Sequence, residues 1–305
     1  MSIQVQNISK SYKNTIAVSN ISFEVKEGEL FGLIGPDGAG KTTLFRILTT
    51  VLLANEGTAT VAGFDVIKDY KAIRNQIGYM PGKFSLYQDL TVAENLAFFA
   101  TIFGTTLEEN YELIKEIYVQ IEPFKNRKAG ALSGGMKQKL ALCCALIHKP
   151  KVLFLDEPTT GVDPVSRKEF WEMLKRLQQK GISILVSTPY MDEAALCDRI
   201  ALIQKGRILK IDTPENITSK YDKTIYNIRT KNTHQLIQDL KKYPSQYSVY
   251  AFGEFIHYID KNSDFNPNEL EDYLKEQNHT EISISVSKTS IEDVFMDLIP
   301  FAISK

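Results

Sequence analysis

A glycine-rich segment near the amino terminus has the residue types and spacing needed to hold phosphate. It runs Gly35-Pro36-Asp37-Gly38-Ala39-Gly40-Lys41-Thr42 and fits the pattern GxxxxGK followed by Ser or Thr. Glycines let backbone N–H groups turn toward phosphate oxygens, and the N-terminus of a following helix favours negative charge. We expect Lys41 to reach the β- and γ-phosphates of a nucleotide and the Thr42 hydroxyl to bind Mg²⁺. A glycine-rich turn with an exposed lysine is the alternative.

Two adjacent carboxylates could supply the metal and water chemistry that such a phosphate site needs. Asp156 and Glu157 directly follow four apolar residues, Val152–Leu155, and so lie at the end of a strand, where ligands bind in open α/β sheets. We expect Asp156 to hold Mg²⁺ through its coordination shell and Glu157 to polarise the attacking water. Alone, the pair could be an ordinary acidic strand end. Together with the glycine-rich segment it predicts a site for phosphoryl transfer.

A second anion site is predicted on the same chain. The segment Leu132-Ser133-Gly134-Gly135-Met136-Lys137-Gln138 places a serine and two glycines at the start of an expected helix, where the helix dipole favours an anion. One nucleotide does not need two phosphate cradles from one subunit. Two chains arranged head to tail would give each nucleotide one cradle from each partner. The alternative is that Ser133 only caps the helix beside a glycine-rich turn. Such capping is also compatible with an anion site.

This second segment resembles the signature motif of the ATP-binding cassette (ABC) superfamily. The resemblance covers residues 1 to about 215 and implies an ATPase that uses MgATP in a dimer. It also implies that Tyr12 stacks on adenine, with a core or turn tyrosine as the alternative, and that Gly161-Val162-Asp163 crosses the dimer interface. The implied nucleotide contacts are Tyr12, Gly35, Pro36, Asp37, Gly38, Ala39, Gly40, Lys41, Thr42, Thr43, Ser133, Gly134, Gly135, Gln138 and Asp163.

Further segments resemble the ATPases of ABC-2 type exporters. They are Tyr190–Ala194 and the end of the tail, Ile291–Phe295. The resemblance implies two partners, a second ABC ATPase chain, identical or not, and a separate transmembrane permease of the ABC-2 type. Phe84–Asn95 resembles the segment that meets such a permease, with ordinary core packing as the alternative. The implied location is cytoplasmic, peripheral on the cytoplasmic face of the cell membrane through the partner.

Two positions depart from the family's pattern. Gly82 stands where the family usually has Gln, and Pro189 stands where it usually has His. The Gln normally touches Mg²⁺ and the water, the His normally contacts the γ-phosphate, and neither Gly nor Pro has a side-chain hydrogen-bonding group. We therefore expect slow hydrolysis, faster when Gln and His are restored. Asp37, commonly Asn, is a lesser departure. Candidate substitutes for the missing groups are an ordered water beside Gly82 and the side chains of Lys83, Thr188 and Tyr190.

Two other functions remain open. One is an ABC ATPase that acts on nucleic acid or the ribosome, although the chain lacks the second cassette or long coiled coil that such proteins usually carry. The other is a regulatory subunit that closes on ATP but hardly turns it over. Gly82 and Pro189 favour this second alternative, whereas intact Lys41, Asp156 and Glu157 oppose it.

The elements that must position these residues follow an alternating pattern through residue 212. Short apolar runs typical of strands buried on both faces alternate with amphipathic helices, which predicts βαβ units and a mostly parallel sheet. The predicted fold is α/β, a P-loop NTPase core with a parallel sheet and an antiparallel edge sheet. Strands are expected at Ile3–Val5, Ile16–Val25, Leu30–Ile34, Val152–Leu155 and Ile182–Val186, and helices at Leu44–Leu53 and Pro164–Gln179.

Two regions differ from this alternation. Residues about 91–148 are helix-rich, with Thr91 and Glu94 at capping-box spacing and a helix over Asn110–Ile121, and so predict a helical subdomain inserted in a domain of residues 1–214. Residues 215–305 predict a small α+β accessory domain. Its strands are expected at Ile225–Ile228, Tyr247–Phe252, Phe255–Ile259 and Ile282–Val286, and its helices at His234–Leu240, Leu270–Leu274 and Ile291–Leu298.

Composition limits the possible partners. The 305 residues carry a formal net charge of −1, with 43% hydrophobic and 24% charged residues, so no global basic field favours nucleic acid and none is expected as partner. No secretory leader is expected at Met1–Lys10, and no apolar run approaches the roughly 20 residues of a membrane span; any permease would be another chain. The three cysteines show no metal spacing and are expected to be buried thiols in a reducing cytosol, namely Cys143, Cys144 and Cys197.

Overall fold

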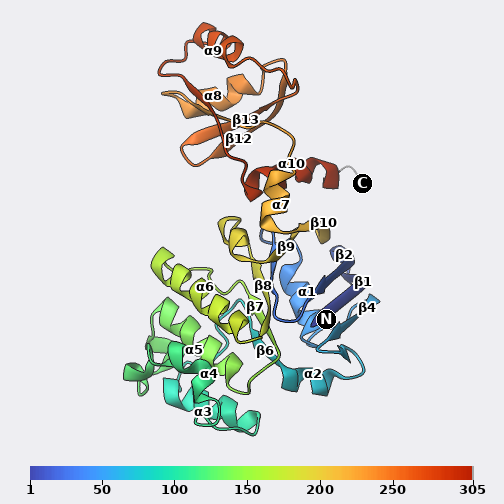
Figure 1. Cartoon of the computed structure of the whole chain (residues 1–305), viewed down its shortest axis with the longest axis vertical. Helices are drawn as coiled ribbons and strands as arrows, with labels where there is room; N and C mark the ends of the chain where they lie inside the picture. The colour runs from blue at the N-terminus through green and yellow to red at the C-terminus, as the bar shows by residue number, and fades with distance from the viewer. Residues whose placement is uncertain (304–305) are drawn as a thin grey trace. The chain divides into compact units, whose positions relative to one another are not determined.

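The computed structural model describes residues 1–303 of the chain, which divides into two compact units. The first unit is Met1–Pro214 and the second is Glu215–Lys305, of which residues 304–305 lie outside the described part. Figure 1 shows the order of the elements in each unit. Each unit has its own hydrophobic cluster, so each is described by itself.

The first unit is built on a six-stranded sheet in the order β10-β9-β3-β8-β7-β6. Its five strands from β9 to β6 pair in parallel, and β10 pairs antiparallel to β9. Every residue of β3, β7 and β8 is buried, as the apolar runs predicted. The strands are β3 (Leu30–Ile34), β6 (Ile77–Met80), β7 (Val152–Asp156), β8 (Ser183–Thr188), β9 (Arg199–Gln204) and β10 (Arg207–Asp212).

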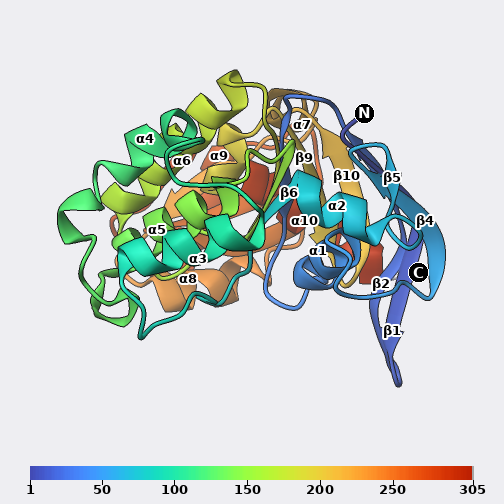
Figure 2. The same cartoon turned by 90° about the horizontal axis from the view of Figure 1, so that it is seen from below.

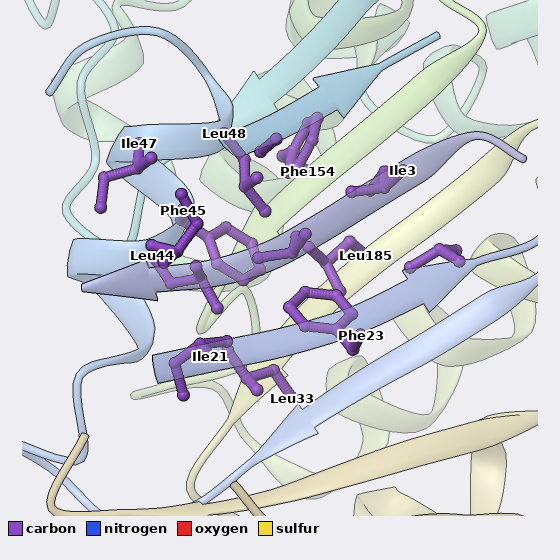
Figure 3. Close-up of a cluster of buried hydrophobic side chains, with 14 of the residues drawn as sticks. Ile3, Ile21, Phe23, Leu33, Leu44, Phe45, Ile47, Leu48, Phe154 and Leu185 are labelled. Atoms are coloured by element: carbon purple, nitrogen blue, oxygen red, sulfur yellow. The ribbon is translucent and has the colours of Figure 1, made fainter. Parts of the chain in front are cut away.

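An antiparallel sheet packs against this parallel one and confirms the predicted edge sheet. Its order is β2-β1-β4-β5, with β1 (Ile3–Tyr12), β2 (Thr15–Val25), β4 (Glu56–Val61) and β5 (Phe64–Asp65). Helix α1 (Lys41–Leu48) contributes Leu44, Phe45 and Leu48 to the core shared by the two sheets (Figure 3). Phe45 meets Phe154 of β7 edge to face at 5.9 Å. This contact fixes α1 over the parallel sheet and thereby fixes the loop that leads into it.

Helices gather on one side of the first unit. They are α3 (Val92–Ile102), α4 (Tyr111–Tyr118) and α5 (Gly134–Leu146), and α5 contacts both of the others as well as α6 (Pro164–Gln179) (Figure 2). The predicted capping box is confirmed: the Thr91 hydroxyl accepts from the Glu94 N–H at 3.2 Å, and the Glu94 carboxylate accepts from the Thr91 N–H at 2.8 Å. A further helix, α2 (Tyr70–Gln76), precedes β6.

The second unit is an antiparallel sheet with helices, and so confirms the predicted α+β class. The sheet order is β12-β13-β11-β14, and its core includes Ile228, Leu236, Tyr258 and Leu270. The strands are β11 (Tyr226–Arg229), β12 (Gln246–Phe252), β13 (Phe255–Asp260) and β14 (Ser283–Val286); the helices are α7 (Pro214–Ser219), α8 (Thr233–Leu240), α9 (Pro267–Glu276) and α10 (Ile291–Ile303).

One predicted boundary is wrong where it matters for the site. The helix expected over Leu44–Leu53 begins at Lys41 and ends at Leu48. It ends early because Thr50 adopts a left-handed φ of 63°, while Val51 and Leu53 are more than 60% exposed. The apolar run therefore extends past the end of the helix, but these later residues do not belong to the hydrophobic core. The early start puts Lys41 in the first turn, beside the glycine-rich loop. The sequence pattern also failed to predict β4, β5, β6, β9, β10, α2 and α7.

Two further observations bear on composition. Within residues 1–303, no helix combines the length and the apolar character that a membrane crossing requires. Cys143, Cys144 and Cys197 are buried free thiols, as predicted. Burial raises the pKa of all three thiols above the ordinary value, as expected for thiols in apolar surroundings.

Candidate nucleotide-binding site

Three parallel strands bring the predicted phosphate and metal residues to one edge of the sheet. The strand order places β8 between β3 and β7, with Ile34 beside Thr188 and Asp156 beside Ser187. The loop after β3 begins with a hydrogen bond from the Gly35 N–H to the Thr188 carbonyl at 3.2 Å. The carboxyl ends of parallel strands are where ligands bind in open α/β folds. This edge is therefore the candidate site.

The loop Gly35–Gly40 needs glycine for steric reasons. A Cβ on Gly35 would lie 2.2 Å from the Ile203 carbonyl oxygen. Gly40 has a φ of 103°, and a Cβ there would lie 2.4 Å from the Ala17 carbonyl oxygen. Only glycine fits such close approaches of backbone to backbone. The loop thus packs against the strands with Asp37 exposed at its turn.

Lys41 is the centre of the site. It is 3% exposed, and its Nζ donates to the Gly35 carbonyl at 2.7 Å and the Pro36 carbonyl at 3.0 Å. The same Nζ lies 3.0 Å from Glu157 Oε1. A buried ammonium needs such partners because an unpaired buried charge is costly. Bound phosphate oxygens could replace these acceptors with charge-assisted hydrogen bonds.

The two carboxylates at the end of β7 have different surroundings. Asp156 is 1% exposed and accepts a hydrogen bond from the Ser187 hydroxyl at 2.7 Å. Glu157 is partly exposed and adopts a left-handed φ of 51°, which turns its side chain toward Lys41. Burial, together with the nearby charge of Asp156, raises the pKa of Tyr79 to about 12. The site thus holds one enclosed carboxylate, Asp156, and one partly exposed carboxylate, Glu157.

Of the two departures from the family's pattern, Gly82 lies beside this pair and Pro189 follows the end of the neighbouring strand β8. A Cβ on Gly82 would lie 3.0 Å from the Asp156 carbonyl oxygen, so the loop carrying Gly82 packs closely against the end of β7. Pro189 directly follows Thr188. The Thr188 hydroxyl donates to the Glu193 carboxylate and accepts from the Tyr190 N–H. Thr188 is therefore already engaged and does not replace the missing groups as a free hydroxyl.

The other candidate substitutes have different surroundings. The Tyr190 ring lies against the Arg167 guanidinium, at 4.2 Å. Lys83 is exposed on the loop that carries Gly82. Lys83 therefore stays a candidate substitute, because its ammonium group is exposed and could turn toward a phosphate.

The second anion cradle lies at the start of α5, far from the glycine-rich loop in the sequence. Ser133 is the N-cap of α5 and its hydroxyl accepts from the Met136 N–H at 3.4 Å. A Cβ on Gly135 would lie 2.9 Å from Ser166 Oγ of α6, so this glycine also marks a close approach. The hydroxyl and the first glycine stay exposed, which leaves the helix N-terminus open to a ligand.

A cavity of about 170 Å³ lies between the start of α5 and Glu157. Its lining includes Gly82, Glu157, Gly134 and Gln138. The Gln138 Oε1 atom is buried and has no hydrogen-bond partner among the described residues. The structure therefore brings part of the signature segment near Glu157. Within residues 1–303, no hydrogen bond or ion pair joins Leu132–Gln138 to Gly35–Thr43.

Four other residues predicted to contact the nucleotide also lie in the first unit. Asp163 is the N-cap of α6 and accepts from the Ser166 and Val165 N–H groups at 3.0 and 3.1 Å; these donors lower the pKa of Asp163. Tyr12 ends β1 with an exposed ring, 5.9 Å from Lys10 Nζ. Thr42 and Thr43 follow Lys41 in the first turn of α1 and are partly exposed. Their roles toward a nucleotide stay predictions.

Sequence reasoning missed Ser187 and Glu193. Ser187 bonds to both members of the carboxylate pair, and Glu193 is 2% exposed and accepts from the Thr159 and Thr188 hydroxyls. A signal was present, because two hydroxyl residues follow three apolar ones at the carboxyl end of a buried strand. Polar residues at the carboxyl end of a buried parallel strand point to a site.

Comparison with known proteins agrees with this geometry. The family model for ABC transporters matches residues 18–160. The chain is 39% identical over 287 residues to the probable multidrug ABC transporter ATP-binding protein YbhF of Escherichia coli, covering 93% of this chain and 49% of that protein. It is 33% identical over 302 residues to Nod factor export ATP-binding protein I of a Rhizobium species, covering 98% and 97%. The chain thus spans about half the length of YbhF.

A solved structure is also similar. It is the dimeric, post-hydrolysis state of the ATP-binding cassette MJ0796 bound to ADP and Pi, with a TM-score of 0.63 and 26% identity over 69% of this chain and 98% of that one. The fold and the loop around Lys41 define a P-loop nucleotide-binding protein. Within that class, the chain belongs to the ATP-binding proteins of ABC transporters.

Replacing Lys41 should weaken nucleotide binding. Lys41→Ala removes a charge-assisted contact to the phosphates, and we expect a loss of about 1.5–3 kcal/mol, which is roughly ten- to hundredfold in affinity. Equilibrium binding of a fluorescent ATP analogue measures the change. Lys71→Ala, which removes an exposed charge on α2, is the matched control and should bind as the unchanged chain does. Equal affinity in Lys41→Ala would refute the site.

Proposed function

We propose that the chain binds and hydrolyses MgATP at a head-to-tail dimer interface and powers a separate membrane permease of the ABC-2 type in the direction of export. The observation that carries the proposal is the pairing of two features on one chain. One is the buried Lys41 beside Glu157, at 3.0 Å. The other is the open anion cradle at Ser133 on another element. The dimeric state of the similar cassette with ADP and Pi supports the same arrangement.

Roles follow for the residues of the site. Glu157 polarises the attacking water, and Asp156 with Thr42 holds Mg²⁺. The glycine-rich loop and Lys41 bind the phosphates, Tyr12 stacks on adenine, and the partner's signature segment closes the nucleotide from the other side. The donor set fits Mg²⁺, which prefers oxygen ligands and few carboxylates beside phosphate. Residues 1–214 form the ATPase domain with a helical subdomain at about 91–148, and residues 215–305 form an accessory domain.

Export and a membrane partner are supported by two observations. The relatives named above are a multidrug transporter protein and a Nod factor export protein. The first unit also has an apolar groove of about 420 Å³ whose lining includes Val51, Leu86, Ile102 and Phe103. Val51 and Ile102 are 62% and 58% exposed, so the groove presents apolar side chains gathered in one place, which a partner could cover. We assign this groove to a cytosolic segment of the permease and the chain to the cytoplasmic face of the membrane.

A second candidate function is a regulatory subunit of a heterodimeric transporter. The observation that favours it is the pair of departures at Gly82 and Pro189, which offer no side-chain donors, together with the engaged Thr188 hydroxyl. In that case the chain would lend Ser133 to a partner with the better catalytic site. Turnover by the purified chain separates this function from the first.

Hydrolysis should be slow and should depend on Glu157. We expect phosphate release by the purified chain that is lost in Glu157→Gln. Pro189→His should raise the rate, because one preorganised transition-state contact can be worth about a hundredfold. Gly82→Gln should help less than the sequence alone suggests, since its Cβ would lie 3.0 Å from the Asp156 carbonyl oxygen and the loop must shift. No detectable release in either the unchanged chain or Pro189→His would defeat the homodimeric ATPase and leave the regulatory subunit.

ATP should drive dimer formation when hydrolysis is stalled. In Glu157→Gln, we expect MgATP to convert monomers into dimers in sedimentation velocity, because each nucleotide is held by two chains. Adding Ser133→Arg should abolish the shift, since a bulky cation would fill the anion cradle. Ser263→Arg, on an exposed loop of the second unit, is the matched control. A dimer that forms equally well with Ser133→Arg would contradict the head-to-tail model.

The apolar groove should be needed for attachment to the membrane. Ile102→Glu places a charge in the groove, and we expect a smaller membrane-bound fraction of the chain when cells expressing it are fractionated. Ile67→Glu is the control, because Ile67 is 53% exposed and lies outside the groove lining. Both variants should keep their affinity for the fluorescent ATP analogue. An unchanged membrane fraction in Ile102→Glu would remove the groove as the docking surface.

A further inference from the structure

We propose that Ser187 is a positioning residue that orients both Asp156 and Glu157 for Mg²⁺ binding and hydrolysis. The inference deepens the proposed function and rests on it. Ser187 belongs to β8, which lies between the strand of the phosphate loop and the strand of the carboxylate pair. It contacts no nucleotide in this assignment and acts through the two carboxylates.

One hydroxyl serves both acidic residues. Ser187 Oγ donates to Asp156 Oδ1 at 2.7 Å and accepts from the Glu157 N–H at 3.0 Å. Ser187 and Asp156 are 0% and 1% exposed, so water does not compete for either bond. Among the described residues, this is the one side-chain hydrogen bond to the Asp156 carboxylate. Pinning Oδ1 fixes the rotamer and leaves Oδ2 on the side of Gly82, where a Cβ would be 3.9 Å from it.

The backbone of Glu157 also depends on Ser187. Its φ of 51° is a left-handed conformation, which a non-glycine residue adopts at a cost in free energy and which persists only where the surroundings hold it. The Glu157 N–H faces both the Ser187 carbonyl, at 3.1 Å, and the Ser187 hydroxyl. This conformation turns the carboxylate toward Lys41 Nζ. Loss of the hydroxyl would therefore loosen the direction of Glu157 as well as that of Asp156.

The neighbouring hydroxyl on β8 points to a different carboxylate. Thr188 donates to Glu193, which also accepts from Thr159 at 2.7 Å. The two hydroxyls at the end of β8 thus hold the segment after β7 at two places, Ser187 directly and Thr188 through Glu193. Because Gly82 and Pro189 contribute no side-chain hydrogen bonds, Ser187 carries more of the orientation than it would beside a Gln and a His.

The test compares Mg²⁺ dependence in variants of the full chain. For Ser187→Ala we expect kcat to fall ten- to hundredfold, or the Mg²⁺ concentration that half-saturates turnover to rise by the same factor, about the usual effect of removing a partner of a metal ligand. Binding of the fluorescent ATP analogue without Mg²⁺ should not change, because Ser187 does not touch the nucleotide. Ser187→Thr keeps the hydroxyl and should restore most of the loss. Ser187→Cys keeps the volume but donates weakly and should lose Mg²⁺ affinity too.

A matched control lies on the same strand. Ser183 is also buried in β8, but its hydroxyl bonds with the Ser2 hydroxyl at the opposite end, 2.6 Å away. Ser183→Ala should leave the Mg²⁺ dependence as it is. The proposal fails if Ser187→Ala or Ser187→Cys titrates with Mg²⁺ like the unchanged chain, or if Ser183→Ala loses as much.

A second readout separates this inference from the proposed hydrolysis. If the unchanged chain shows no turnover, the Mg²⁺ titration is followed through the bound fluorescent nucleotide instead. A right-shifted titration in Ser187→Ala still supports the positioning role, while the absent turnover counts against the ATPase alone.

Discussion

The site depends on one buried positive charge. Lys41 is almost fully enclosed, and its ammonium group must have acceptors because burying an unpaired charge is costly. Two carbonyls of its own loop and the Glu157 carboxylate meet that need. The loop can bring its carbonyls there only because glycine occupies the positions that approach Ile203 and Ala17. The charge therefore organises the loop and aims Glu157 before any ligand arrives.

Strand register does the rest of the positioning. Three apolar strands buried on both faces pair in parallel, so their carboxyl ends come to one edge. The pairing of Asp156 with Ser187 puts a hydroxyl beside a carboxylate without any loop having to fold there. A site on strand ends is held by the core that packs beneath it, here by contacts such as Phe45 with Phe154. Rigid strand ends suit chemistry that consists mainly of positioning and charge neutralisation.

The sequence predicted the fold class and several elements because their signals are local. Buried strands show as short apolar runs, and the caps at Thr91 and Ser133 show as residue types at fixed spacing. The start of α1 was missed by three residues, since apolar periodicity says nothing about a helix that begins inside a loop of glycines. Ser187 was missed because its partners, Glu157 and Asp156, are 30 and 31 residues away in the chain. Glu193 accepts from Thr188, five residues away, but its second partner, Thr159, is 34 residues away. Only the register of β7 with β8 brings Ser187 beside Asp156. Sequence spacing does not encode that register.

In the proposed function, Gly82 and Pro189 would affect hydrolysis more than nucleotide binding. In the family the Gln and His act on water, Mg²⁺ and the γ-phosphate, whereas the glycine loop, Lys41 and Ser133 act on phosphate binding and closure. Interactions made equally in the ground and transition states set affinity, and only those that strengthen in the transition state set the rate. In the proposed site, Gly82 and Pro189 would therefore lower the rate of hydrolysis while leaving in place the groups that bind the nucleotide. A chain of this kind can close on ATP with full affinity and still turn it over slowly, so affinity and closure alone cannot distinguish an ATPase subunit from a regulatory one.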